Sequence, residues 1–455
     1  MDRCEEVLLR DGLLLSFSSG GVVVRRGSVL VRDGVIEAVG EYSELRAGAR
    51  DPQVVDCRGK VIAPGFVNAH THLAMTLLRG VADEYSTLDW LGVVWPIERR
   101  LRREDVYYGA LLGAVESVLS GTTCVADHYF HEEEAVRAAR AVGLRVVASE
   151  SMLDVDGLCD SREGMRRTLE LWKKYARDPM VRVAFAPHSV YSVRKDVLEE
   201  VAGLAEELGV DVHIHASESA EEVEESLRRY GATPIEYLAK LGLTSRRLLV
   251  AHANVLTDGD VEVIRRRGVR VVHVPTTAMK HGLGLCPVAR LRERGVIVGL
   301  GTDGPCSNNN LDMIEEMRTA VLAQRLFSRN PKALSAQEAL RMATLESARA
   351  LGLRCVGNLA AGYRADLIVI NARGIRLAPL HNVPSHIVFS MSHSDIELVM
   401  VEGRIVAERG RALLVDAEEV VRRVQRAFED LMERCGLEPS LDSEPSRARE
   451  QLVPA

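Results

Sequence analysis

The first residues that could do chemistry are two histidines, His70 and His72, in the stretch VNAHTHLAMTLLRG. They follow the apolar run VIAPGFV, which is typical of a buried strand. Residues two apart on a strand point to the same face, so the two imidazoles would lie side by side and could bind one metal ion. The same spacing would also occur at an ordinary polar strand end, so other motifs in the chain are needed to distinguish a metal site from a structural pair.

Similar polar residues follow four later apolar runs. One histidine at a strand end is more often structural, but several on one rim favour a common site, because barrel enzymes place their chemistry at the carboxyl ends of the strands. These residues are His188 in FAPHS, His215 in VDVHIHASES, His252 in VAHAN and Asp303 in GLGTDG. His213 shares the face of His215 but lies deeper, so we expect a barrel-layer residue there. His128 and His131 have no partner in the pattern and are given no role.

The elements that position these residues alternate between short apolar runs and helical stretches, for example the helices expected over 195–208 and 258–267. Eight strand–helix units predict an α/β fold, a (β/α)8 TIM-like barrel, with a doubly wound open sheet as the alternative. The expected strands are 61–67, 122–127, 144–149, 181–186, 210–215, 248–252, 269–274 and 296–301.

The two ends of the chain have a different sequence pattern, with short apolar runs and glycine turns in place of alternating strands and helices. GSVLVRDGVIEAVG near the start and IELVMVEGRIVAERG near the end each read as a β-hairpin around a glycine turn. We therefore predict a small β-sandwich domain from residues 1–60 and 357–415, and a barrel over 61–356. Residues 416–455 would form an amphipathic helix over 417–434 and a charged tail.

Composition narrows the class of protein. The chain has 455 residues, a net charge of −7 and no basic block with interleaved aromatics, which argues against nucleic-acid binding. It has no apolar run long enough to span a membrane and no signal pattern at its start. Its eight cysteines include no CxxC pair and are expected to be reduced thiols, so we expect a cytoplasmic protein.

The chemistry that the histidines imply is metal-assisted hydrolysis. Three neutral imidazoles and one carboxylate suit one borderline divalent ion, Zn²⁺ first and Fe²⁺ next, which would lower the pKa of a bound water. Glu218, three residues after His215, could take that proton, although a solvated helix start is the plainer interpretation. His252 and Asp303 could orient the water and steady the developing charge. The expected ligands are His70, His72, His215 and Asp303.

Four motifs in this order, PGFVNAHTH, HIHASES, VAHAN and GLGTDG, resemble the amidohydrolase superfamily in its mononuclear deaminase branch. The stretches AHTHLAMTLLRG, LDWLGVVWPIE, YFHEEE and TDGPCSNNNLDMIEEMR are similar to 5'-methylthioadenosine/S-adenosylhomocysteine deaminases and their 5'-deoxyadenosine deaminase relatives. The resemblance implies a zinc-dependent deaminase that converts an adenine nucleoside to its inosine form with release of ammonia. It also implies a homo-oligomer, a dimer or tetramer.

The resemblance assigns roles residue by residue. His70, His72 and His215 match the metal-binding imidazoles, and Asp303 matches the metal-side aspartate that also helps pass a proton to the leaving amine. Glu218 matches the proton-shuttling glutamate that meets the purine ring, and His252 the histidine that orients water. For substrate binding, Glu98 in WPIE matches a glutamate that accepts hydrogen bonds from the ribose hydroxyls, and His188 matches a substrate-contacting histidine. Trp90 and Trp95 would cover the pocket or pack a loop.

Two features of the sequence refine the expectation, and the second departs from the family pattern. The stretch VRVAFAPHS lacks the lysine that bridges two metals in other branches, so a single ion is expected. Where members that act on S-adenosylhomocysteine can use an arginine after the third strand, this chain has Glu150, which would repel a carboxylate. This favours methylthioadenosine, 5'-deoxyadenosine or adenosine.

The alternatives are a hydrolase of a free heterocycle (guanine, a pterin, cytosine or an s-triazine) on the same metal site, and a catalytically inactive barrel that serves as a binding scaffold. Glu98 distinguishes a nucleoside deaminase from a hydrolase of a free heterocycle, because a free base has no ribose diol for Glu98 to bind. Loss of Glu218 or Asp303 would mark the second, and both are present.

Overall fold

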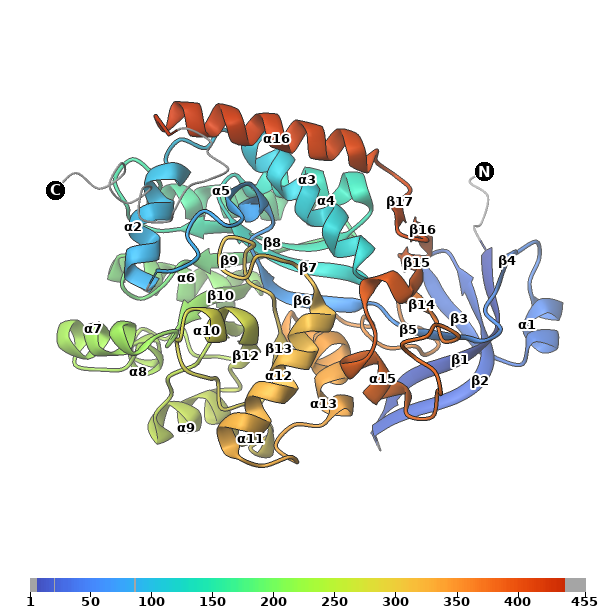
Figure 1. The fold of residues 1–455 in the computed structure, drawn as a ribbon. Helices are drawn as coiled ribbons and strands as arrows, with labels where there is room; N and C mark the ends of the chain where they lie inside the picture. The colour runs from blue at the N-terminus through green and yellow to red at the C-terminus, as the bar shows by residue number, and fades with distance from the viewer. Residues whose placement is uncertain (1–5, 20, 86, 438–455) are drawn as a thin grey trace.

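Eight parallel strands form the centre of the molecule (Figure 1), in the computed structural model that describes residues 6–19, 21–85 and 87–437. Asp303, just after the last strand, donates its N–H to the His70 carbonyl of the first at 3.0 Å, so the sheet is nearly closed into the expected barrel. The strands are β6 (Phe66–Thr71), β7 (Thr122–Tyr129), β8 (Arg145–Met152), β9 (Val181–Pro187), β10 (Asp211–Ala216), β11 (Leu248–His252), β12 (Arg270–His273) and β13 (Val298–Leu300).

The expectation of one strand over 61–67 is wrong, because that run forms two strands in two sheets. β5 (Lys60–Pro64) pairs with the terminal strands, whereas β6 pairs with β7 of the barrel. Gly65 separates them, and a Cβ there would lie 2.2 Å from the Thr123 side chain, so the chain turns where only glycine fits. The predicted domain boundary between residues 60 and 61 falls inside β5.

Helices surround the barrel, except for the first one, which packs on the sheet formed by the chain ends, and their caps explain where several of them start. Asp160, Ser219 and Thr257 each accept backbone N–H groups of the helix that follows them. The α-helices are α1 (Tyr42–Gly48), α2 (Thr87–Glu98), α3 (Arg103–Leu119), α4 (Glu132–Val142), α5 (Ser161–Tyr175), α6 (Lys195–Leu208), α7 (Ala220–Tyr230), α8 (Pro234–Lys240), α9 (Asp258–Arg267), α10 (Pro275–Lys280), α11 (Val288–Glu293), α12 (Met313–Ser328), α13 (Ala336–Arg341), α14 (Ser347–Ala350), α15 (Val383–Phe389) and α16 (Ala417–Arg434). Three further helical segments are the 3-10 helices η1 (Leu73–Leu78) and η3 (His393–Asp395) and the π-helix η2 (Met342–Glu346). The helices expected at α6, α9 and α16 are confirmed to the residue.

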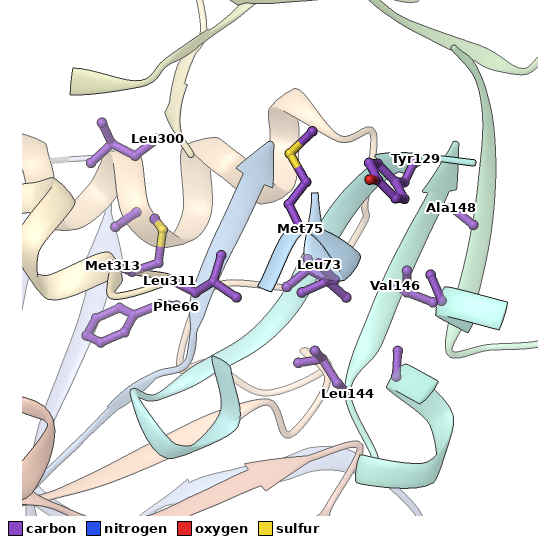
Figure 2. Packing of buried hydrophobic residues seen from close by; sticks show 14 of the residues in the cluster. Phe66, Leu73, Met75, Tyr129, Leu144, Val146, Ala148, Leu300, Leu311 and Met313 are labelled. Carbon is purple, nitrogen blue, oxygen red and sulfur yellow. The ribbon is translucent and has the colours of Figure 1, made fainter. Parts of the chain in front are cut away.

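Two layers of apolar side chains hold the barrel together. Small residues such as Ala69, Cys124 and Ala126 fill its interior. The larger cluster lies between the strands and the surrounding elements; Figure 2 shows Phe66, Leu73 and other members of it. Because this packing continues up to Met75 and Tyr129, the rim of the barrel at β6 and β7 is held by buried contacts.

Strands from both ends of the chain form one mixed sheet beside the barrel (Figure 1). Its order is β17-β16-β15-β14-β5-β1-β2-β3, with β4 on β1. β5 joins the two halves, because it pairs with β1 on one side and with β14 on the other. The two hairpins are confirmed, but the sandwich is not, since these strands belong to a single sheet. The strands are β1 (Glu6–Ser18), β2 (Gly21–Arg32), β3 (Val35–Gly40), β4 (Gln53–Asp56), β14 (Leu367–Asn371), β15 (Ile396–Val401), β16 (Arg404–Glu408) and β17 (Arg411–Ala412).

Ionic contacts fix the neighbouring parts to the barrel. Arg145 at the start of β8 is buried and pairs with Asp366, with Nε 2.8 Å from Oδ2, and it also contacts Glu402 in the hairpin turn of the terminal sheet. α16 lies across α3 (Figure 1), where Arg434 pairs with Asp105 at 2.7 Å. The predicted tail beyond α16 lies mostly outside the described residues. No helix among the described residues is long and apolar enough to cross a membrane.

Candidate active site

The structure brings the predicted site residues together at one end of the barrel. His70 and His72 lie at the end of β6 and just after it, His215 lies on β10, His252 ends β11, and Asp303 follows β13. All five side chains are buried. Two overlapping groups, His70–His72–His215 and His70–His252–Asp303, each have ligand-capable atoms within 4.8 Å of one another. A single divalent ion would fit among them.

Hydrogen bonds from the ring nitrogens support this fit. His72 Nδ1 lies 2.5 Å from the His128 carbonyl, and His215 Nδ1 lies 2.8 Å from the His188 carbonyl. A carbonyl only accepts, so both Nδ1 atoms carry a hydrogen, and Nε2 is the atom through which each ring in its neutral form could bind a metal ion. His70 Nε2 is buried without a hydrogen-bond partner among the described residues, 3.5 Å from Asp303 Oδ1. His72 Nε2 lies 3.1 Å from the same Asp303 oxygen. Imidazole nitrogens grouped with a carboxylate are ligands that zinc prefers.

His213 lies one layer deeper, as expected, and its Nε2 is 3.0 Å from His70 Nδ1. If His70 is to present Nε2 as a ligand, its Nδ1 must carry the hydrogen and donate it to His213. His213 thereby holds the orientation of the His70 ring.

Burial and proximity set the charges of the cluster. Burial lowers the pKa of His215 well below its ordinary range and that of His70 to about 4, so both rings are neutral. For Asp303 burial raises the pKa, but the neighbouring His70 and His72 outweigh it and hold the pKa well below the usual range. Burial lowers the pKa of His72 as well, but the neighbouring Asp303 carboxylate outweighs burial and raises that pKa above its ordinary value. The site therefore offers neutral His70 and His215 rings, a His72 ring paired with Asp303 at 3.1 Å, and an ionised carboxylate.

Glu218 and His252 face each other above this cluster. Glu218 Oε1 lies 3.8 Å from His252 Nε2. Backbone contacts fix Glu218, because its N–H donates to Glu222 at 2.7 Å and its carbonyl accepts from Asn254 at 3.0 Å. Burial, with Asp303 nearby, raises the pKa of Glu218 to about 8, which suits a group that takes up and releases a proton near neutrality.

Two of these residues have strained backbones. His252 has φ of 72° and Asp303 has φ of 64°, values in the left-handed region that residues other than glycine rarely adopt. Such strain is concentrated at functional sites, where the surrounding structure imposes it.

A recess lined in part by His72, His215 and Asp303 opens above the cluster. Glu98, the last residue of α2, lies in its wall with His188, Trp90 and Trp95. Burial raises the pKa of Glu98 to about 7, although the Tyr129 hydroxyl, which donates to Glu98 Oε1 at 2.6 Å, lowers it. His188 is oriented through Nδ1, 2.9 Å from the Ser192 hydroxyl.

Sequence reasoning missed two residues of this recess. His128, given no role, lines it, and its ring stacks on His215 with centroids 4.7 Å apart. Tyr129 also lines it. Their position at the end of β7 was the available signal. His131 lies elsewhere, as the residue that precedes α4.

The expectation that Glu150 repels a substrate carboxylate is not supported by its position. Glu150 accepts the N–H groups of His131 and Glu132 at 3.2 and 2.7 Å and pairs with Arg167 at 3.3 Å. Ser151, the next residue, lines the recess instead. The charge of Glu150 is therefore compensated outside the pocket.

A nearly closed parallel barrel with a histidine cluster at its strand ends is the architecture of a metal-dependent hydrolase, and the chain belongs to the amidohydrolase family, whose model matches residues 61–406. It is 42% identical over 416 residues to a 5'-deoxyadenosine deaminase from Methanothermobacter thermautotrophicus, covering 91% of this chain and 96% of the relative. It is 37% identical over 431 residues to a 5-methylthioadenosine/S-adenosylhomocysteine deaminase from Pelotomaculum thermopropionicum, covering 94% and 99%. A zinc-bound adenosine deaminase structure from Xanthomonas campestris superposes with a TM-score of 0.90 at 33% identity, covering 94% of this chain and 99% of that one.

Proposed function

We propose that this protein is a zinc-dependent deaminase that hydrolyses an adenine nucleoside to its inosine form and ammonia. The observation that carries the proposal is the buried carboxylate of Glu98 in the same recess as the histidine cluster. Relatives over almost the whole chain are named as deaminases of 5'-deoxyadenosine and of 5'-methylthioadenosine/S-adenosylhomocysteine.

His70, His72, His215 and Asp303 would hold the single divalent ion. When bound, the ion lowers the pKa of water and polarises the reacting centre. Three imidazoles with one ionised carboxylate suit Zn²⁺. The zinc bound to the adenosine deaminase of similar fold supports this choice over Fe²⁺.

The remaining groups move protons and orient the reactants. Glu218 takes a proton from the attacking water and delivers it to N1 of the purine, for which its pKa of about 8 is suited. His252, 3.8 Å from Glu218, orients the water for attack on C6. Asp303 then helps pass a proton to the departing amine, which leaves as ammonia while the purine keeps the oxygen of the water at C6. His188 contacts the substrate from the wall of the recess.

Glu98 distinguishes a nucleoside from a free base. An ionised carboxylate accepts both vicinal ribose hydroxyls, and no such group exists on guanine or an s-triazine. The test is Glu98→Ala with adenosine and guanine as substrates, following ammonia release. We expect a loss of at least tenfold in kcat/KM on adenosine. Unchanged activity on the best substrate would reject the nucleoside assignment in favour of the free heterocycle.

A second recess favours accepting S-adenosylhomocysteine beside the neutral 5' substituents. It shares Glu98 and Phe130 with the first recess, and it is lined by acidic side chains as well as by Arg99. A zwitterionic amino acid group at the 5' end finds both signs of charge there. Arg99→Ala should lower kcat/KM for S-adenosylhomocysteine but not for 5'-deoxyadenosine.

Two further expectations stay predictions. A homo-oligomer, a dimer or tetramer, is compatible with the exposed apolar side chains of Leu322, Leu326 and Phe327 on one helix, α12. Light scattering at several protein concentrations would measure the subunit count. The cytoplasmic location rests only on the sequence pattern.

A further inference from the structure

Tyr129 ends β7 with its side chain buried at the rim of the barrel. Figure 2 places it in the same apolar cluster as Leu73 and Met75. Its ring also lies against Phe130 and His72, with centroids 5.2 and 6.2 Å away. The position of its hydroxyl is therefore set by packing before any substrate enters.

That hydroxyl reaches a group on a different element. Tyr129 Oη donates to Glu98 Oε1 at 2.6 Å, and both residues line the recess. Glu98 belongs to α2, which contains Pro96 and contributes Trp90, Leu91 and Trp95 to the wall. This hydrogen bond ties the last residue of α2 to the barrel.

The contact decides how Glu98 presents its oxygens. A carboxylate has about four acceptor positions, and Tyr129 occupies one on Oε1. The rotamer that this bond selects leaves Oε2 and the second position of Oε1 for other donors. A donor to the charged form also favours ionisation, which opposes the effect of burial on Glu98. An ionised carboxylate accepts hydroxyl donors, whereas a protonated one would also have to donate.

We propose that Tyr129 is a positioning residue, which fixes the Glu98 carboxylate for the ribose diol and so sets the preference for ribonucleosides over nucleosides that lack the hydroxyls. This inference rests on the proposed function. It adds a residue whose role is exerted through Glu98, and it predicts a dependence on the sugar that a purely structural tyrosine would not have.

The test compares adenosine with 2',3'-dideoxyadenosine, which differ only in the two hydroxyls, in the wild-type enzyme and in Tyr129→Phe. Phenylalanine keeps the ring and its packing but removes the donor. Hydrogen bonds to charged groups contribute enough that we expect about a tenfold fall in kcat/KM for adenosine, mostly as a rise in KM. The value for the dideoxy substrate should change less than about twofold on the same reasoning. If the dideoxy substrate is deaminated too slowly to measure, its inhibition constant against adenosine deamination is compared instead of kcat/KM.

The Glu98→Ala background provides the matched control. There Tyr129→Phe should leave the adenosine to dideoxyadenosine ratio unchanged, because the group that it positions is gone. If Tyr129→Phe alone lowers kcat/KM equally for both substrates, or lowers it for neither, the adenosine to dideoxyadenosine ratio stays at the wild-type value. That result would overturn the inference and make Tyr129 a core residue. A wild-type enzyme that deaminates neither these two nor 5'-deoxyadenosine, methylthioadenosine or S-adenosylhomocysteine would instead reject the proposed function, and the inference with it.

Discussion

Replacing His213 with leucine should weaken metal binding without a change in any ligand. His213 Nε2 is 3.0 Å from His70 Nδ1, and both residues are buried, with His70 fully so. Leucine has a similar volume but cannot accept a hydrogen bond. The His70 Nδ1–H would then be buried without a partner, and the ring would lose the contact that orients Nε2.

The size of the effect follows from the buried contact. Leaving a buried donor unpaired costs about 1–3 kcal/mol, and each 1.4 kcal/mol is about a factor of ten in an equilibrium constant. We therefore expect zinc affinity to fall about 10- to 100-fold, the range usual for partners of metal-bound histidines.

The assay is a zinc titration of the metal-free protein in competition with a chromophoric chelator. His213→Gln is the matched control, because its amide oxygen can still accept from His70, and it should lose less affinity than His213→Leu. Circular dichroism checks that both variants fold. A folded His213→Leu protein with the wild-type zinc affinity would refute the reasoning that His213 orients His70.

Three other substitutions test separate parts of the account. Glu218→Gln should lower kcat by about 10²–10⁴ with zinc content unchanged by metal analysis, as expected for loss of a general acid–base group, and activity within tenfold of wild type would contradict its role. Burial raises the pKa of Glu316 from 4.5 to about 8. Between these two pH values the folded protein holds a proton on Glu316 that the unfolded chain has released. The free energy of unfolding therefore falls as the pH rises from 4.5 to about 8. Glu316→Gln should therefore match the wild-type Tm near pH 5 and exceed it near pH 8 in thermal melts, and an equal difference at both pH values would count against the shift. Arg145→Met leaves Asp366 buried without its partner and should cost about 3–5 kcal/mol of stability in urea unfolding, whereas a wild-type midpoint would show that the pair does not join the sheet to the barrel.

Much of the barrel follows from local pattern. Apolar runs bounded by turn residues gave β11 its correct bounds, and the capping residue Thr257 marks the start of α9. The apolar run at 61–67 predicts a single strand, because periodicity cannot show that its two halves pair with different sheets. Only the close approach of Thr123 to Gly65 makes the break necessary, and that contact is between segments far apart in the chain.

In the candidate site, too, some residues could be predicted from local sequence pattern and others depend on contacts between distant segments. His70 and His72 could be paired from spacing alone, because a strand places alternate residues on one face. The link between Glu98 and Tyr129 spans 31 positions and two different elements, so no local pattern predicts it. Glu150 shows the opposite error, since its place in the sequence indicated a pocket residue, whereas its hydrogen bonds to the start of α4 and its pairing with Arg167 hold it elsewhere.

The most direct test of the account is ammonia release, with the accompanying change in purine absorbance, from purified zinc-loaded protein. The substrates are 5'-deoxyadenosine, methylthioadenosine, adenosine, S-adenosylhomocysteine and guanine, each in a separate reaction. The account predicts turnover of the adenine nucleosides and none of guanine. Turnover of guanine alone, or of no purine nucleoside, would contradict the assignment of Glu98 and the proposed reaction.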